Sequence, residues 1–126
     1  MEPLIIESTL KTPEIRFNSH SGIFDIKGMS CAEYALDFYK PVFNWLDKYI
    51  ENPLPKTTFN IQFKYFNTSS AKCILQLFEK VSKVELLGST VEINWYYNKN
   101  DEQMLSDGEN YSEIIGIEFK LLEIAK

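Results

Sequence analysis

Polar and apolar residues alternate in short runs near the start of the chain. Residues 4–6 are apolar, and Pro13 separates them from residues 14–17, where polar and apolar side chains alternate. The alternation resumes at residues 24–27, after a polar loop at residues 18–22. Because a period of two is typical of half-buried strands, this region predicts short strands with a hairpin-type loop between them.

A long helix is predicted next. Ser30 is followed three residues later by Glu33, which matches a capping box and places the helix start at Ser30. Apolar residues then recur at spacings of three and four, which indicates one helical face. The residues of this face are Ala35, Phe38, Val42, Trp45, Leu46 and Tyr49. Pro41 lies inside the helix and lacks a backbone donor, so we expect a kink or a break there.

The clearest strand covers residues 59–65. Its odd-numbered side chains, Tyr65 included, are apolar or aromatic and are expected to share one face, whereas the even-numbered ones are polar. A polar turn at residues 67–70 leads into a second helix. The apolar face of this helix is formed by Ile74, Leu77, Phe78 and Val81. Another alternating run at residues 91–97 predicts a further strand.

The remainder of the chain is strongly acidic at first. Residues 101–113 hold five acidic side chains and no Lys or Arg. A short helix from Asp101 to about Ser106 fits this stretch. Residues 114–124 fit either a strand or a helix, and Gly116 together with the β-branched isoleucines favours a strand.

The order of these elements predicts the fold class. Strand–helix–strand crossovers imply parallel pairing, with the helices packed on the sheet. We therefore expect an α/β fold, with residues 1–126 forming a single domain. Its sheet is expected to be mixed, with two main helices packed on it and a short acidic helix in addition.

Composition limits the class of partner. The chain has 126 residues, of which 44% are hydrophobic, and this supports a packed core without a metal or a disulfide. Its net charge is −5 and Arg16 is its one arginine, so neither nucleic acid nor an anionic membrane surface is an expected partner. We recognise no signal peptide and no membrane span, and we expect a cytoplasmic location.

Side chains suited to catalysis are scarce. His20, the single histidine, lies in a predicted polar loop, and Cys31 and Cys73 are expected to be reduced thiols rather than a disulfide. A calcium loop read from Asn98 into the acidic stretch needs a glycine at its sixth position, where Gln103 stands. We therefore expect no enzyme activity, no metal and no cofactor.

The turn at residues 67–70 carries the most informative polar groups. Thr68 lies between a strand and a helix, where a hydroxyl residue commonly serves as a helix cap or first-turn residue. The same position suits a phosphate, because free amides and the helix dipole favour negative charge. Three adjacent hydroxyls, those of Thr68, Ser69 and Ser70, leave the acceptor ambiguous on these grounds.

Five motifs in a fixed order resemble those of a known protein family. They are Thr-Pro-Glu-Ile at 12–15, Ile-Lys-Gly-Met-Ser at 26–30, Phe-Tyr-Lys-Pro-Val at 38–42, Tyr-Phe-Asn-Thr-Ser-Ser-Ala-Lys at 65–72, and Trp-Tyr-Tyr at 95–97 followed by Asp-Glu at 101–102. With this order and spacing the chain resembles the SiaC-like family of bacterial regulatory phosphoproteins over nearly its whole length.

The resemblance implies a fold similar to that of STAS-type anti-sigma factor antagonists and a phosphoacceptor threonine in the Asn-Thr-Ser-Ser turn, here Thr68. It implies a partner serine/threonine kinase that phosphorylates this residue and a PP2C-like phosphatase that restores it. It also implies that the unphosphorylated form binds and promotes a diguanylate cyclase. The resulting cyclic di-GMP would favour aggregation or biofilm formation.

A partner is expected to dock across the turn and the exposed face of the second helix. The residues predicted to bind it are Asn67, Ser69, Ser70 and Lys72. Burying a phosphate against a partner costs desolvation unless a cation meets it, so phosphorylation is expected to weaken binding. An anti-sigma factor is the alternative target of the same switch. A small enzyme or metal binder acting through the acidic stretch is a third hypothesis.

Overall fold

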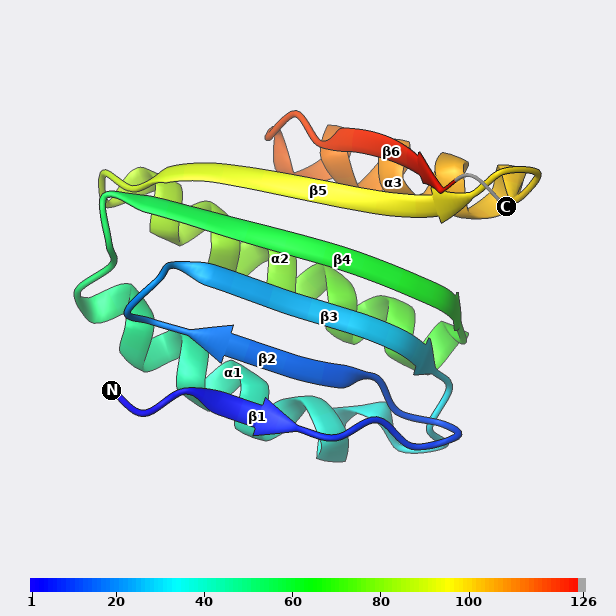
Figure 1. The fold of residues 1–126 in the computed structure, drawn as a ribbon, viewed down its shortest axis with the longest axis horizontal. Helices are drawn as coiled ribbons and strands as arrows, with labels where there is room; N and C mark the ends of the chain where they lie inside the picture. The colour runs from blue at the N-terminus through cyan, green and yellow to red at the C-terminus, as the bar shows by residue number, and fades with distance from the viewer. Residues whose placement is uncertain (125–126) are drawn as a thin grey trace.

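The structure is a computed structural model, and it describes residues 1–124. Its strands are β1 (Leu4–Ile6), β2 (Glu14–Asn18), β3 (Ile23–Ser30), β4 (Lys56–Phe66), β5 (Thr90–Asn98) and β6 (Lys120–Ile124). Its helices are α1 (Ala35–Glu51), α2 (Thr68–Leu86) and α3 (Glu102–Ile115). The strands form one six-stranded sheet in the order β1-β2-β3-β4-β5-β6 (Figure 1). The first two pairings are antiparallel and the other three are parallel, which confirms the predicted α/β fold with a mixed sheet.

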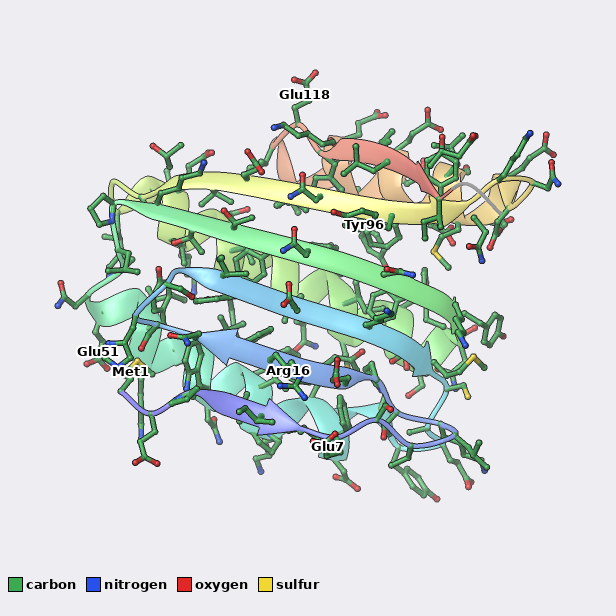
Figure 2. The ribbon with its side chains drawn as sticks, in the orientation of Figure 1. Met1, Glu7, Arg16, Glu51, Tyr96 and Glu118 are labelled. Atoms are coloured by element: carbon green, nitrogen blue, oxygen red, sulfur yellow. The ribbon has the colours of Figure 1, made fainter. Side chains whose placement is uncertain are left out.

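All three helices lie on one face of the sheet (Figure 1). Each helix connects two neighbouring parallel strands, and crossovers of one hand between successive neighbours place every helix on the same side. The opposite face of the sheet is open and carries polar side chains. Figure 2 shows Arg16 of β2 and Tyr96 of β5 projecting from this open face.

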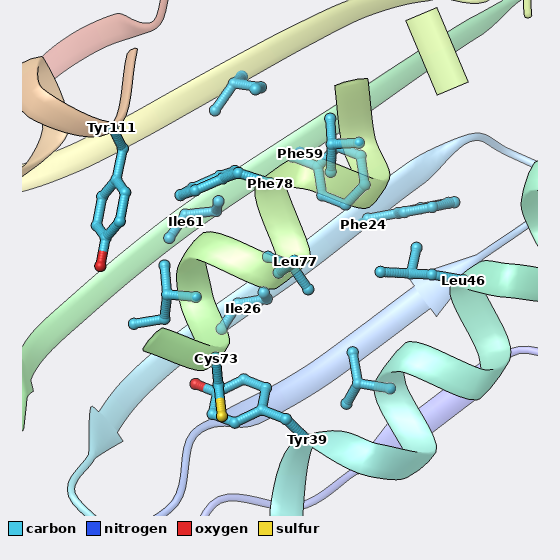
Figure 3. Packing of buried hydrophobic residues seen from close by; sticks show 14 of the residues in the cluster. Phe24, Ile26, Tyr39, Leu46, Phe59, Ile61, Cys73, Leu77, Phe78 and Tyr111 are labelled. Atoms are coloured by element: carbon cyan, nitrogen blue, oxygen red, sulfur yellow. The ribbon is translucent and has the colours of Figure 1, made fainter. Parts of the chain in front are cut away.

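The core lies between the sheet and the helices and is rich in aromatic rings (Figure 3). Phe24 of β3 packs against Phe59 of β4 with 4.9 Å between ring centroids, and against Tyr49 of α1 at 4.8 Å. Nearer the β6 edge of the sheet, Trp95 of β5 is fully buried and contacts Phe78 of α2. Such tilted and edge-to-face ring pairs stabilise a core beyond the apolar area that they bury.

The predicted start of the first helix is wrong. Ser30 is the last residue of β3, and α1 begins at Ala35 with Tyr34 as an N-cap that makes no side-chain capping hydrogen bond. Ser30 stays in the sheet because it pairs with Phe66 of β4. The spacing of Ser30 and Glu33 is therefore a chance match to a capping box.

The break considered at Pro41 does not occur. The helix α1 continues through Pro41 from Ala35 to Glu51. Both Pro41 and Asp37, whose carbonyl would have accepted the missing hydrogen bond, are exposed. Water can therefore bond to that carbonyl, which lowers the cost of a proline inside a helix.

The predicted face of Tyr65 is also wrong, because β4 contains an irregularity. Gly28 of β3 pairs with Phe63, but the next residue of β3 pairs with Tyr65, so Lys64 is one additional residue in β4. An added residue reverses the alternation of side chains. Phe66 therefore turns toward the core, and Tyr65 is exposed.

The acidic helix is longer than predicted. The helix α3 covers 14 residues and ends at Ile115, followed by the C-cap Gly116, whose positive φ of 73° is the left-handed conformation common at helix ends. Its buried residues are Met104, Gly108 and Tyr111, at spacings of four and three. The strand favoured for residues 114–124 is correct only for Lys120–Ile124, which form β6. Ile114 and Ile115 belong to α3 instead.

Candidate functional site

Asn67 fixes the start of α2. Its side-chain oxygen accepts a hydrogen bond of 2.9 Å from the Ser70 amide, and its side-chain nitrogen donates to the Ala32 carbonyl at 3.2 Å. Its backbone amide donates to the Ser30 carbonyl at 3.0 Å. Asn67 is thus the N-cap, and Thr68 is the first residue of the helix. These bonds hold the turn against the end of β3.

Ser70 faces the interior of the protein. Its side chain is 0% exposed, and its hydroxyl accepts a hydrogen bond of 2.8 Å from Ser30. The Ser30 hydroxyl in turn lies 2.7 Å from the hydroxyl of Tyr39 in α1. The prediction that Ser70 binds a partner is therefore wrong, because its side chain is closed off from the surface.

Thr68 and Ser69 lie in different surroundings. The Ser69 side chain is half-buried, and its hydroxyl accepts a hydrogen bond of 3.3 Å from the Ala35 amide at the start of α1. Thr68 is exposed, and its hydroxyl makes no hydrogen bond within residues 1–124. Of the three adjacent hydroxyls, the one of Thr68 is open to another protein.

A shallow depression of about 460 Å³ lies beside Thr68. It is lined by Leu36, Thr68, Ser69, Lys72, Cys73 and Gln76. The large side chains of Tyr34 and Leu36, at the start of α1, are 71% and 55% exposed. Exposed apolar groups beside such a depression are typical of protein-binding surfaces.

Two buried tyrosines are hydrogen-bonded to the first turn of α2, Tyr111 directly and Tyr39 through Ser30. Burial raises the pKa of Tyr39, and its hydrogen bond with Ser30 partly opposes this. The Tyr111 hydroxyl of α3 donates to the Ala71 carbonyl at 2.9 Å, and burial raises the pKa of Tyr111 as well. Figure 3 shows Tyr39 next to Cys73 of α2. Burial also raises the pKa of the Cys73 thiol, which keeps it protonated and unreactive.

The other candidate residues do not gather into a site. His20 is exposed in the turn between β2 and β3, and both Cys31 and Cys73 are free thiols. Within residues 1–124, no group of three or more His, Cys, Asp or Glu side chains is arranged to hold a metal ion. No helix in the same range combines the length and the apolar character needed to cross a membrane.

Two parts of this arrangement are absent from the sequence predictions. The contact of Ser30 with Tyr39 and Ser70 joins three segments that are distant in the chain, and no local pattern signals it. The sequence alone could have indicated that Leu36 is exposed, since it is a large apolar residue that lies off the predicted apolar face of its helix. One exposed apolar residue is common on protein surfaces, and Leu36 becomes informative because the fold places it beside Thr68.

Residues 6–124 match the family model described as SiaC family regulatory phosphoprotein. The chain belongs to the SiaC family. A family relative in Pseudomonas aeruginosa strain UCBPP-PA14, a protein described as uncharacterized, is 22% identical over 121 residues that cover 96% of each chain.

Solved structures of SiaC from Pseudomonas aeruginosa share the fold of this family member. Apo-SiaC is 21% identical and has a TM-score of 0.87, with 97% of this chain and 99% of that chain covered. The second is a crystal structure of the diguanylate cyclase SiaD in complex with its activator SiaC. Its matching chain is 21% identical and has a TM-score of 0.88, with 96% of this chain and 99% of that chain covered.

Proposed function

We propose that this SiaC family protein is a non-enzymatic activator of a diguanylate cyclase, switched off by phosphorylation of Thr68. In the unphosphorylated form it binds the cyclase and promotes synthesis of cyclic di-GMP, which favours aggregation or biofilm formation. A serine/threonine kinase adds the phosphate, a PP2C-like phosphatase removes it, and all of these steps take place in the cytoplasm.

The single observation that carries this proposal is the exposure of Thr68 beside two hydroxyls that are engaged. Ser70 is fully buried and Ser69 accepts a hydrogen bond from α1. A kinase must bring the acceptor oxygen into line with the γ-phosphorus of ATP, and a buried hydroxyl cannot reach that position. The family match supports a regulatory phosphoprotein.

The chemistry of the switch leaves the fold intact. The Thr68 oxygen attacks the γ-phosphorus of ATP, the bond to the ADP oxygen breaks, and the hydroxyl proton passes to a base of the kinase. In dephosphorylation, water attacks the phosphorus, the bond to the Thr68 oxygen breaks, this oxygen takes up a proton, and inorganic phosphate is released. Because the Thr68 side chain points to solvent, the phosphate adds about −1.5 to −2 charges to the surface and displaces no core group.

The block on binding follows from the position of Thr68 at the depression. Leu36 lines the depression, and Tyr34, two residues earlier in the chain, is also exposed, so both supply apolar area for a partner. A phosphate placed there must lose water when the partner docks, and this loss costs binding energy unless the partner supplies a cation. The SiaC–SiaD complex supports a cyclase as the partner class.

Phosphate mapping tests the acceptor. The protein is incubated with its cognate kinase and ATP, and the modified residue is located by mass spectrometry. We expect one phosphate at Thr68 in the natural protein and in the Ser69→Ala control, and none in Thr68→Ala. Unchanged labelling of a folded Thr68→Ala protein would refute the assignment.

A further inference from the structure

The residue one helical turn after Thr68 is a lysine. Lys72 lies four positions along α2, and side chains four apart are neighbours on a helix surface. Both residues line the same depression. An anionic group that precedes a lysine by four positions has the more favourable of the two orientations for an ion pair.

The charge of Lys72 is free in the unphosphorylated protein. Lys72 is exposed, and within residues 1–124 no carboxylate lies within ion-pair distance of its ammonium group. By contrast, Lys80 of the same helix is paired with Asp47 of α1 at 2.6 Å. Among the described residues that line the depression, Lys72 is the one with a formal charge.

We propose that Lys72 is the group through which the Thr68 phosphate acts. In the unphosphorylated protein, Lys72 pairs with an acidic side chain of the cyclase. In the phosphorylated protein, its ammonium group pairs with the phosphate of its own chain and is no longer available to the partner. This inference rests on the proposed function and adds to it the residue that reads the phosphate and the charge of the partner group.

The Thr68 phosphate is expected to bind the Lys72 ammonium group more strongly than an acidic side chain of the partner does. A phosphate carries about −1.5 to −2 charges near neutral pH, whereas a carboxylate carries one, and the phosphate is held on the same helix as the lysine. The phosphate also lies at the N-terminal end of α2, where the helix dipole favours negative charge. Phosphorylation therefore neutralises the free cation of this surface and leaves excess negative charge in its place.

The titration of the phosphate itself tests the pairing without any partner. Phosphorus NMR follows the second ionisation of phosphothreonine 68 between about pH 4 and pH 8, around its usual pKa of about 6. We expect the pKa to be about 0.3 higher in Lys72→Gln than in the natural sequence, since Lys72 stabilises the dianion. Lys83→Gln, an exposed lysine in the last turn of the same helix, is the matched control and should leave it unchanged. Equal pKa values in all three proteins, or an equal rise in Lys72→Gln and Lys83→Gln, would overturn the proposal.

Binding to the cyclase tests the other half of the competition. In the unphosphorylated state, Lys72→Gln should bind about two- to fivefold more weakly than the natural protein, and Lys83→Gln should bind equally well. Phosphorylation should then weaken binding of Lys72→Gln by a smaller factor than it weakens the natural protein, because the two changes act on one charge. The same factor in both proteins would overturn the role of Lys72 while leaving the Thr68 switch intact. If phosphorylation leaves cyclase binding of the natural protein unchanged, the proposed function fails instead, and the NMR titration still decides the pairing.

Discussion

Thr68 and Ser70 are two residues apart, yet their hydroxyls lie in opposite surroundings. Ser70 shares the buried face of α2 with Ile74 and Leu77, which follow it by four and seven positions, whereas Thr68 faces solvent. The apolar spacing of the second helix thus already separates the two hydroxyls in the sequence. The sequence predictions did not use this signal and kept both as candidates.

The buried tyrosine beside this turn makes a prediction about stability at high pH. Burial raises the pKa of Tyr39 in the folded protein above its unfolded value near 10, so folding favours the protonated form. Its contribution is fully present below about pH 10 and is lost as the pH rises further toward the folded pKa. We expect Tyr39→Phe to be about 1 kcal/mol less stable at pH 7, because the bond to Ser30 is lost.

The same variant should lose stability less steeply above about pH 10 than the natural protein does. Denaturant midpoints measured by circular dichroism at pH 7 to 11 check this. Tyr34→Phe, which changes an exposed tyrosine, is the control and should follow the natural curve. A slope for Tyr39→Phe as steep as that of the natural protein would show that Tyr39 is not the group responsible.

At the scale of elements, periodic apolar residues predicted the helices and strands well. The strands at residues 59–65 and 91–97 and the apolar face of the second helix are present as β4, β5 and α2. The strand register and the helix start that depend on pairing with distant segments could not be predicted from the local sequence. The irregularity that exposes Tyr65 arises from the register between β3 and β4, and the start of α1 is delayed because Ser30 pairs with Phe66.

The packing of α3 on the sheet depends on a glycine that looks unfavourable in the sequence. Gly108 lies in the helix interior, where glycine is usually less stable than alanine. In the fold, a Cβ at this position would lie 2.5 Å from Cδ1 of Trp95, whose indole nitrogen donates to the Met104 carbonyl at 2.9 Å. The absent side chain lets α3 approach the sheet, a tertiary contact that no local pattern indicates.

Gly108→Ala is therefore expected to destabilise the protein, although helix propensity alone would predict that alanine stabilises it. Trp95 is fully buried and cannot move aside freely, so we expect a loss of about 1–3 kcal/mol in the free energy of unfolding. Urea denaturation followed by circular dichroism measures it. Ser106→Ala, at an exposed position of the same helix, should stay within about 0.5 kcal/mol of the natural protein. A gain in stability for Gly108→Ala would contradict the close packing of α3 on Trp95.

At the scale of the whole molecule, the sheet order places the starts of α1 and α2 side by side. Both helices follow parallel neighbouring strands, and the Ala35 amide contacts the Ser69 hydroxyl. This brings Leu36 next to Thr68 and Lys72, although more than 30 residues separate them in the chain. A surface formed by two distant segments can be recognised only once the fold is known. The turn proposed to carry the phosphate lies within one segment, so the sequence alone could indicate it.

The most direct test compares cyclase binding by the unphosphorylated protein and by the protein phosphorylated at Thr68. Isothermal titration calorimetry with the partner diguanylate cyclase gives both affinities, and cyclic di-GMP production by the same samples gives the functional readout. We expect the unphosphorylated protein to bind and to raise cyclic di-GMP synthesis, and the phosphorylated protein to bind at least about tenfold more weakly, since an uncompensated buried charge costs more than about 1.4 kcal/mol. Equal affinity and equal activation by the two forms would contradict the account.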